Sequence, residues 1–313
     1  MKKTSVKRKK PLTLRQFMKR NWGQFILHAI FLFYSVCYVY PMALAIMASF
    51  THQDVFDDPY IGLSLFPAKL TLDGYKAIWL EPSLVVNGYR NTIAFSVLST
   101  VLMLVLCGLF AYPLSRSHFY FRKPINTLLI VMMLFSGGGT ASYIVNTQLL
   151  HLKGSFWAYI WPYLFTSWNV ILMRTNFKSV PGELLESARM DGASELRTCF
   201  TIIFPLCKAT MAALAFSFLI GRWSDWGTTI TYLSTNTELW SLSYAMYRVD
   251  QTVKMLTEQY ERGEISLAEL NNSIPEDSLQ FAMALITTGP VMVIFPAFQK
   301  YFAKGMIVGS VKG

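Results

Sequence analysis

The sequence predicts an all-α protein that crosses a membrane six times. Apolar residues make up 53% of the 313 positions and charged residues only 15%, which is too apolar for an ordinary soluble domain. The apolar residues gather in six runs, each close to the ~20 residues that a helix needs to cross the hydrocarbon core. Basic residues gather between alternate runs. We therefore expect a polytopic helical membrane protein.

The six predicted spans cover residues 25–50, 92–114, 125–146, 156–173, 209–233 and 278–302. The fourth span is the shortest, and Arg222 and Asp225 interrupt the fifth, so the ends of these two are the least regular. The first span is longer than the core of a signal peptide and lacks a suitable small-residue cleavage site. We therefore expect it to remain as a membrane helix.

Basic residues predict the orientation, because they collect on the cytoplasmic flanks of membrane helices. Residues 1–20 hold nine basic residues and no acid. The segments after the second, fourth and sixth spans also hold more basic than acidic residues. We expect both termini in the cytoplasm. The net charge of +10 then reflects topology and contact with anionic lipid, and a nucleic-acid partner is not expected.

This topology divides the chain into three parts. Residues 1–24 form a basic cytoplasmic tail, residues 25–302 the transmembrane domain, and residues 303–313 a second cytoplasmic tail. Two longer stretches, 52–88 and 234–277, would face outward. In the first we expect a turn at Asp73 and Gly74 followed by a short helix. The second has apolar residues at helical spacing from Leu242 to Leu256, and a later helix is expected over residues 267–271.

The polar loop between spans four and five, residues 179–206, predicts two helices joined by a glycine turn. Ser179 can cap the first helix, with Pro181 and Glu183 in its first turn. Asp191 and Gly192 then end it, because glycine accepts the left-handed conformation. Ser194 can cap the second helix, which runs toward Pro205.

The first of these helices has about nine residues, too few to be stable alone in water. Leu184, Leu185 and Ala188 are expected to share one of its faces. Something must pack on that face, so the loop predicts a partner protein.

The loop resembles a known motif. Glu186, Ser187 and Ala188 are followed by three residues, Gly192, nine residues and then Ile202-Ile203-Phe204-Pro205. This spacing is similar to the EAA loop of permease subunits in bacterial ABC importers, with Ser187 and Phe204 as departures that keep small and apolar character. Trp223-Ser224-Asp225-Trp226 and the final residues from Gln299 onward resemble the carbohydrate-importer branch, close to the MalG-like permeases.

The resemblance implies a type I ABC importer permease fold and a set of partners. These are a second homologous permease subunit, two cytosolic ATPase subunits that bind ATP and Mg, an external binding protein and a carbohydrate substrate. This chain would bind no cofactor itself. The residues implied to contact the ATPase are Leu184, Leu185, Glu186, Ser187, Ala188, Asp191 and Gly192. The stretches 52–88 and 234–277 would either cover the helix bundle or receive the binding protein.

The fifth span carries the first candidates for the substrate path. Arg222 and Asp225 are three residues apart, so they lie on nearly one helical face and can pair. Charged groups at membrane depth usually face a bundle interior or a water-filled path. Trp223 and Trp226 add rings that suit the apolar face of a pyranose. The alternative is an ion pair near the outer interface with the two tryptophans anchored among lipid headgroups.

The glycine run at residues 136–140 is the second candidate. Consecutive glycines destabilise a helix by about 1 kcal/mol each relative to alanine, so something must offset them. Close contact with a neighbouring helix is the favoured explanation. The alternative is an unwound backbone at Gly137 and Gly138 that exposes carbonyls to a passing solute. Asn91, Asn146, Asn169, Thr228 and Thr231 could add polar groups, although such residues more often bond between helices.

Motifs that are absent from the sequence exclude other functions. No G-x-x-x-x-G-K-[ST] phosphate loop occurs, so ATP hydrolysis is expected in another subunit. The four histidines are scattered, and no H-E-x-x-H or intramembrane carboxylate pair occurs, which argues against an enzyme. An importer permease for peptide or phosphate remains open. An ion-coupled secondary carrier is a weaker alternative, because it would leave the cytoplasmic loop unexplained.

Overall fold

The computed structural model describes residues 22–56, 64–79, 82–264, 266 and 276–310. Helices account for nearly all the regular structure in these ranges, and the one β feature recorded there is an isolated bridge between Thr51 and Leu70. The all-α prediction is therefore confirmed. The helix predicted over residues 267–271 and most of the N-terminal tail lie outside the described residues.

Three helices are long. They are α2 (Trp22–Ser49), α5 (Pro82–Ser115) and α15 (Glu276–Ser310). The outer-segment helices are α3 (Gln53–Phe56), α4 (Asp73–Ile78) and α13 (Leu242–Glu261). The central helices are α6 (Arg122–Leu134), α7 (Gly138–Ile144), α8 (Ser167–Lys178) and α12 (Lys208–Trp223). The loop helices are α9 (Gly182–Met190), α10 (Glu195–Thr198) and α11 (Phe204–Leu206).

The remaining elements are tight or wide helical turns. The 3-10 turns are η2 (Phe156–Tyr159), η3 (Trp161–Tyr163) and η6 (Thr237–Leu239). The π-helical turns are η1 (Val145–Leu149), η4 (Cys199–Ile203) and η5 (Thr229–Leu233).

The length and apolar composition of the helices support a multi-pass membrane protein, but they do not confirm that it has six membrane spans. In the described residues, 3 helices are long and apolar enough to cross a membrane, or up to 5 if each of two bent pairs counts as one span. The first, second and sixth predicted spans correspond to α2, α5 and α15. Helix α5 begins ten residues before the predicted start of the second span, and α15 continues beyond residue 302 into the predicted tail.

The fourth predicted span, residues 156–173, is wrong as a single helix. The turns η2 and η3 occupy its first half, and α8 begins only at Ser167. Pro162 lies in the first turn of η3, and the Thr166 hydroxyl accepts from the Asn169 amide to cap α8. Because an N-cap residue has non-helical backbone angles, Thr166 starts a new helix where a continuous one was expected.

The glycine run separates α6 from α7, and these two helices form a bent pair with an angle of 112°. Gly138 has φ +79°, a left-handed conformation that favours glycine. A Cβ added at Gly138 or Gly139 would meet no described atom within 4 Å. No described helix of this chain therefore packs closely on Gly138 or Gly139, and the backbone is bent, whereas contact of its carbonyls with a solute stays a prediction.

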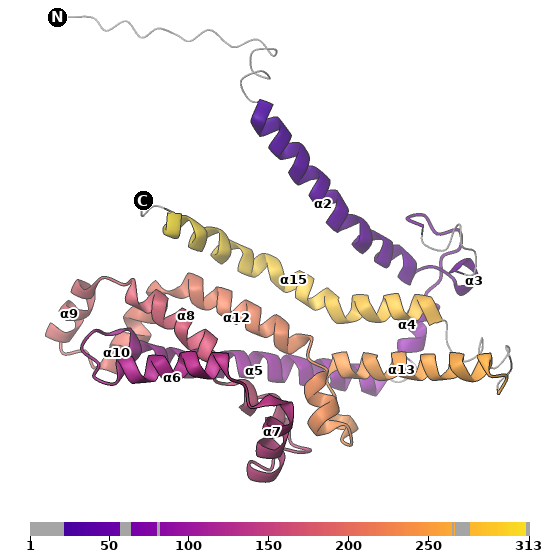
Figure 1. Ribbon diagram of the computed structural model, residues 1–313. Coiled ribbons are helices and arrows are strands. Elements are labelled where there is room, and N and C mark those ends of the chain that lie inside the picture. Colours follow the sequence, from indigo (N-terminus) through magenta and orange to yellow (C-terminus); the bar gives the residue numbers. More distant parts are fainter. Residues whose placement is uncertain (1–21, 57–63, 80–81, 265, 267–275, 311–313) are drawn as a thin grey trace, which may run out of the picture.

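Helix α5 is the centre of the bundle (Figure 1). It contacts α8 and α12 along one part of its length and α13 along another. One buried cluster joins Met103 and Cys107 of α5 to Met173 of α8 and Ile203 of the loop. A second cluster joins Val85, at the start of α5, to residues of α4, α13 and α15. Helix α5 therefore connects the two ends of the molecule as one continuous helix.

The loop helices and the predicted outer segments lie at opposite ends of the bundle, as Figure 1 shows for α9 and α13. Helices α3 and α4 pack beside the start of α15 at the same end as α13. Asp73 and Gly74 belong to the first turn of α4, whereas the sequence predicted a separate turn there. A Cβ on Gly74 would lie 2.8 Å from the Ser278 carbonyl oxygen, so only glycine allows this close approach of α4 and α15.

Candidate functional site

The first arm of the loop is α9, and it begins differently from the prediction. Ser179 ends α8: it is the C-cap residue, and its hydroxyl donates to the Asn176 carbonyl at 2.6 Å. Pro181 is the N-cap residue of α9, with no side-chain capping bond. Ser179 as the cap of α9 is therefore wrong, because its hydroxyl is already used by the helix before it.

The turn between the two arms forms as predicted. Gly192 has φ +77°, and its amide donates to the Arg189 carbonyl at 3.0 Å. The Ala193 amide donates to the Ala188 carbonyl at 2.9 Å, which completes the end of α9. The Ser194 hydroxyl then accepts from the Arg197 amide and caps α10. The glycine turn and the second cap are both confirmed.

The inner face of α9 is covered by the chain itself. Leu185 is 5% exposed and Ala188 7%, and Leu185 belongs to the cluster that includes Met173 and Ile203. Leu184 is 46% exposed. The expectation that all three share one face open to a partner is wrong for Leu185 and Ala188. Leu185 and Ala188 are three residues apart, so they lie on the same helical face, and that face packs on the core. Leu184 lies on a different face and points outward.

The outer face of the loop combines polar and apolar groups. Glu186, Ser187, Asp191 and Gly192 are exposed, as a docking role requires. The large exposed apolar side chains of the loop are Leu184, Met190, Leu196, Phe200 and Leu206. Met190 is 88% exposed and was not singled out from the sequence. Its position directly before the Asp191–Gly192 break is the signal that could have identified it.

Glu195 is held in its ionised form at the start of the second arm. The hydrogen bond from the Tyr112 hydroxyl, followed by the charge of Arg189, keeps the pKa of this carboxyl below its usual range although burial opposes them. Glu195 lies in the polar loop between the fourth and fifth predicted spans. At neutral pH Glu195 is therefore a carboxylate bonded to a residue of α5.

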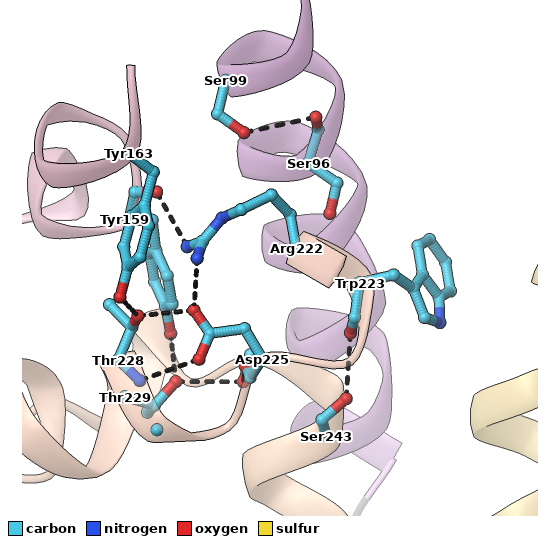
Figure 2. Close-up of polar contacts among 12 residues, drawn as sticks. Ser96, Ser99, Tyr159, Tyr163, Arg222, Trp223, Asp225, Thr228, Thr229 and Ser243 are labelled. Atoms are coloured by element: carbon cyan, nitrogen blue, oxygen red, sulfur yellow. Dashed lines mark hydrogen bonds and ion pairs between the residues drawn. The ribbon is translucent and has the colours of Figure 1, made fainter. Parts of the chain in front are cut away.

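The predicted pair in the fifth span forms at the end of α12 (Figure 2). Arg222 Nη1 lies 2.6 Å from Asp225 Oδ2, and Arg222 Nη2 donates to the Tyr159 carbonyl at 2.9 Å. The guanidinium lies over the Tyr163 ring, 3.8 Å from its centroid. Arg222 is 5% exposed. The pairing is confirmed, and its position is a buried one.

Hydroxyl groups complete the surroundings of this pair. Asp225 accepts from the amide and the hydroxyl of Thr228, and the Tyr163 hydroxyl lies 2.8 Å from the Thr228 hydroxyl. The Tyr159 hydroxyl lies 2.6 Å from Thr229 Oγ1. The sequence indicated Thr228 but missed Tyr159 and Tyr163, because both lie in the segment predicted as a simple helix. We call Arg222, Asp225, Tyr159, Tyr163, Thr228 and Thr229 the buried polar cluster.

The two tryptophans next to the pair have different surroundings. Trp223 is 4% exposed, and its Nε1 donates to the Thr287 carbonyl at 2.8 Å. Trp226 is 45% exposed and stacks on Tyr247 with ring centroids 4.8 Å apart. Gly137 and Gly138 are exposed. The candidates for the substrate path therefore do not converge on one open site in this chain.

Other polar residues singled out from the sequence bond between segments. Asn91 Nδ2 donates to the Glu238 and Trp240 carbonyls, and Asn146 Nδ2 donates to the Tyr232 hydroxyl. A cavity of about 650 Å³ lies between the start of α5 and α13, with Trp240 in its wall. Neither the glycine run nor the buried polar cluster lines it.

No family model matches the chain. A galactooligosaccharides transport system permease protein of Bacillus subtilis, GanQ, is 30% identical over 287 residues, covering 90% of this chain and 93% of the relative. The polygalacturonan/rhamnogalacturonan transport system permease protein YtcP of the same organism is 29% identical, covering 95% of this chain and 100% of the relative.

A solved structure shares the fold. It is a crystal structure of a bacterial ABC transporter involved in the import of the acidic polysaccharide alginate, 24% identical, with a TM-score of 0.75. The match covers 93% of this chain and 99% of that chain.

We call the two short helices α9 and α10, joined by the turn at Gly192, the elbow. The helical bundle with this elbow at one end has the fold of an ABC importer permease subunit. Within that class, the identity to GanQ over nearly the whole of both chains is decisive. The chain belongs to the family of permease subunits of carbohydrate ABC transport systems. It is a multi-pass membrane protein and a transport subunit.

Proposed function

We propose that this chain forms half of the translocation path of an ATP-driven saccharide importer in the bacterial cell membrane. A second homologous permease subunit forms the other half. Two cytosolic ATPase subunits hold ATP and Mg and seat against the loop at residues 179–206, and a separate binding protein delivers the saccharide to the opposite face. Both termini lie in the cytoplasm.

The elbow is the observation that carries this proposal. Its turn depends on a glycine with φ +77°, its inner face is anchored in the core, and its outer face offers Leu184, Met190 and Glu186 to a partner. It lies at the end of the bundle opposite α13, so a motor on one side and a delivery protein on the other can act at once (Figure 1). The basic residues beside the loop favour a cytoplasmic location.

Reconstitution of the assembly tests this function. The chain is purified with its co-encoded subunits, placed in proteoliposomes with ATP on the side of the loop, and supplied with the binding protein and labelled saccharides. We expect oligosaccharides of the kinds named for the relatives to be the first to stimulate ATP hydrolysis and uptake.

Three results would overturn the proposal. Stimulation by a peptide or by phosphate alone would assign a different solute. Uphill transport without any ATPase subunit would show an ion-coupled carrier. If no ATPase subunit co-purifies with the chain, the proposal that the elbow binds an ATPase would be wrong.

We propose that solute contact on this chain involves Trp226 and the exposed glycine backbone at Gly137 and Gly138, with Arg222, Trp223 and Asp225 holding the nearby backbone in place. An exposed ring can stack on a sugar, whereas the buried side chains of this group cannot reach a sugar without rearrangement.

Replacing Trp226 by alanine is expected to raise the saccharide concentration that gives half-maximal uptake. Trp22→Ala is the control, because Trp22 is also exposed (59%) and lies at the start of α2, outside the two outer segments. Equal uptake curves for the two variants would contradict the role of Trp226.

A further inference from the structure

The cytoplasm-side end of α5 is bonded directly to the elbow. The Tyr112 hydroxyl donates to Glu195 Oε2, and Tyr112 is 7% exposed in the last turn of α5. Glu195 is the first residue of α10. A hydroxyl bonded to a carboxylate is among the stronger and more directional contacts a protein makes. The second arm of the elbow thus has a polar attachment to the central helix.

The same carboxylate also joins the two arms of the elbow. Arg189, in the last turn of α9, places Nη2 2.9 Å from Glu195 Oε1 and donates from Nε to that oxygen at 3.0 Å. Arg189 Nη2 also lies 3.2 Å from His118 Nε2, in the connection that follows α5. Each arm of the elbow therefore has a polar contact with α5 or with the residues directly after it.

The end of α5 is fixed to α8 as well. Arg116 Nη2 donates to the Phe177 carbonyl at 2.9 Å, and its guanidinium lies 5.2 Å from the centroid of the Tyr112 ring. Arg174 of α8 donates from Nε to the Leu114 carbonyl at 3.1 Å. The end of α5 is therefore bonded to α8 through Arg116 and Arg174, while Tyr112 itself bonds to the elbow.

We propose that Tyr112 is a positioning residue that transmits movement of the elbow to α5, through its hydrogen bond to Glu195. The inference rests on the proposed function, because it assumes that an ATPase moves the elbow. Apolar contacts such as that of Leu185 permit sliding, since they have no preferred direction. A hydroxyl–carboxylate bond has a preferred distance and direction, so displacement of α10 is passed to α5. Helix α5 continues to α13 at the far end, which is where the saccharide would arrive.

The test uses the complete assembly and the variant Tyr112→Phe, which keeps the buried ring and removes only the hydroxyl. We expect ATP hydrolysis to continue while saccharide uptake falls by about 2- to 30-fold, the range by which residues along a coupling network change coupling. The measured quantity is the number of ATP molecules hydrolysed per saccharide imported. A purely structural role would lower both rates together and leave this ratio unchanged.

Two further variants make the result decisive. Tyr120→Phe removes the hydroxyl of a tyrosine that is 87% exposed in the connection after α5, and it should keep the wild-type ratio. Glu195→Gln changes a side chain that is 56% exposed, so the protein should fold, and it should raise the ratio in the same direction as Tyr112→Phe. The double variant should be no worse than Glu195→Gln alone, because Glu195→Gln already weakens the contact that Tyr112→Phe removes, in addition to the ion pair with Arg189.

A wild-type ratio in both Tyr112→Phe and Glu195→Gln would overturn the inference while leaving the proposed function intact. If the wild-type assembly itself shows no ATP-driven uptake, the proposed function falls and the inference falls with it. The two failures are therefore distinguishable from the wild-type control.

Discussion

Replacing Asp225 by asparagine is expected to destabilise the protein by about 3–5 kcal/mol, the usual effect of removing one partner from a buried ion pair. The side chains of Arg222 and Asp225 are only 6% and 13% exposed, so the remaining guanidinium would be a buried cation without a counter-charge. Arg222 Nε already lacks a hydrogen-bond partner among the described residues. The free energy of unfolding in detergent, from denaturant titration of wild type and variant, measures the loss.

A second ion pair provides a control, which shows how much of the lost stability comes from burial of the pair and how much from the loss of one charge. Asp250, whose side chain is 23% exposed, pairs at 2.7 Å with the 56% exposed Lys254 one turn further along α13, and Asp250→Asn should change the free energy of unfolding by only about 0.3–0.5 kcal/mol. Replacing both members of the buried pair, Arg222→Met with Asp225→Leu, should restore much of the stability lost in Asp225→Asn. An Asp225→Asn variant that loses no more than Asp250→Asn would show that the pair is not buried in the assembled protein.

Replacing Gly192 by valine is expected to abolish saccharide uptake while the protein still inserts in the membrane. Nothing described lies within 4 Å of a Cβ at this position, so the effect comes from the backbone alone. A β-branched residue at φ +77° is strained by about 1–3 kcal/mol, which the exposed turn can relieve by changing shape. ATP-driven uptake and the amount of membrane-inserted protein, measured on the same proteoliposomes, give the two readouts.

Two other substitutions test whether the left-handed turn is the cause. Gly23→Val adds the same side chain in the first turn of α2, outside the loop, where the space is also open and φ is not positive, and it should leave uptake nearly unchanged. Gly192→Asn should retain part of the uptake, because asparagine tolerates the left-handed region better than valine. Full uptake by Gly192→Val would contradict the docking role of the elbow.

Local features of the sequence predicted well wherever one residue type enforces one backbone conformation. Gly192 was assigned to the left-handed turn and Ser194 to the cap of the second arm, and both are confirmed. The apolar repeat from Leu242 predicted α13, which the structure places at Leu242–Glu261. The long apolar run near the N-terminus corresponds to α2.

Predictions from the sequence failed in segments whose composition is compatible with two different backbone conformations. Residues 156–173 are apolar enough for a span, yet the Thr166 cap divides them into turns and a helix. The glycine run was assigned to close helix contact, and it is a bend of 112°. Hydropathy measures how apolar a segment is, but it does not indicate whether that segment is one helix or two short pieces packed in the protein.

The sequence by itself determined the class of protein: a helical membrane protein, with a glycine elbow in a polar loop and an arginine–aspartate pair in its fifth apolar run. Those features follow from local rules of hydropathy, capping and helical spacing. Only the tertiary structure decided that Leu185 faces the core, that Tyr159 and Tyr163 enclose Arg222, and that Tyr112 bonds to Glu195. These contacts join residues up to 83 positions apart, and no local pattern specifies which distant side chain will satisfy a buried polar group.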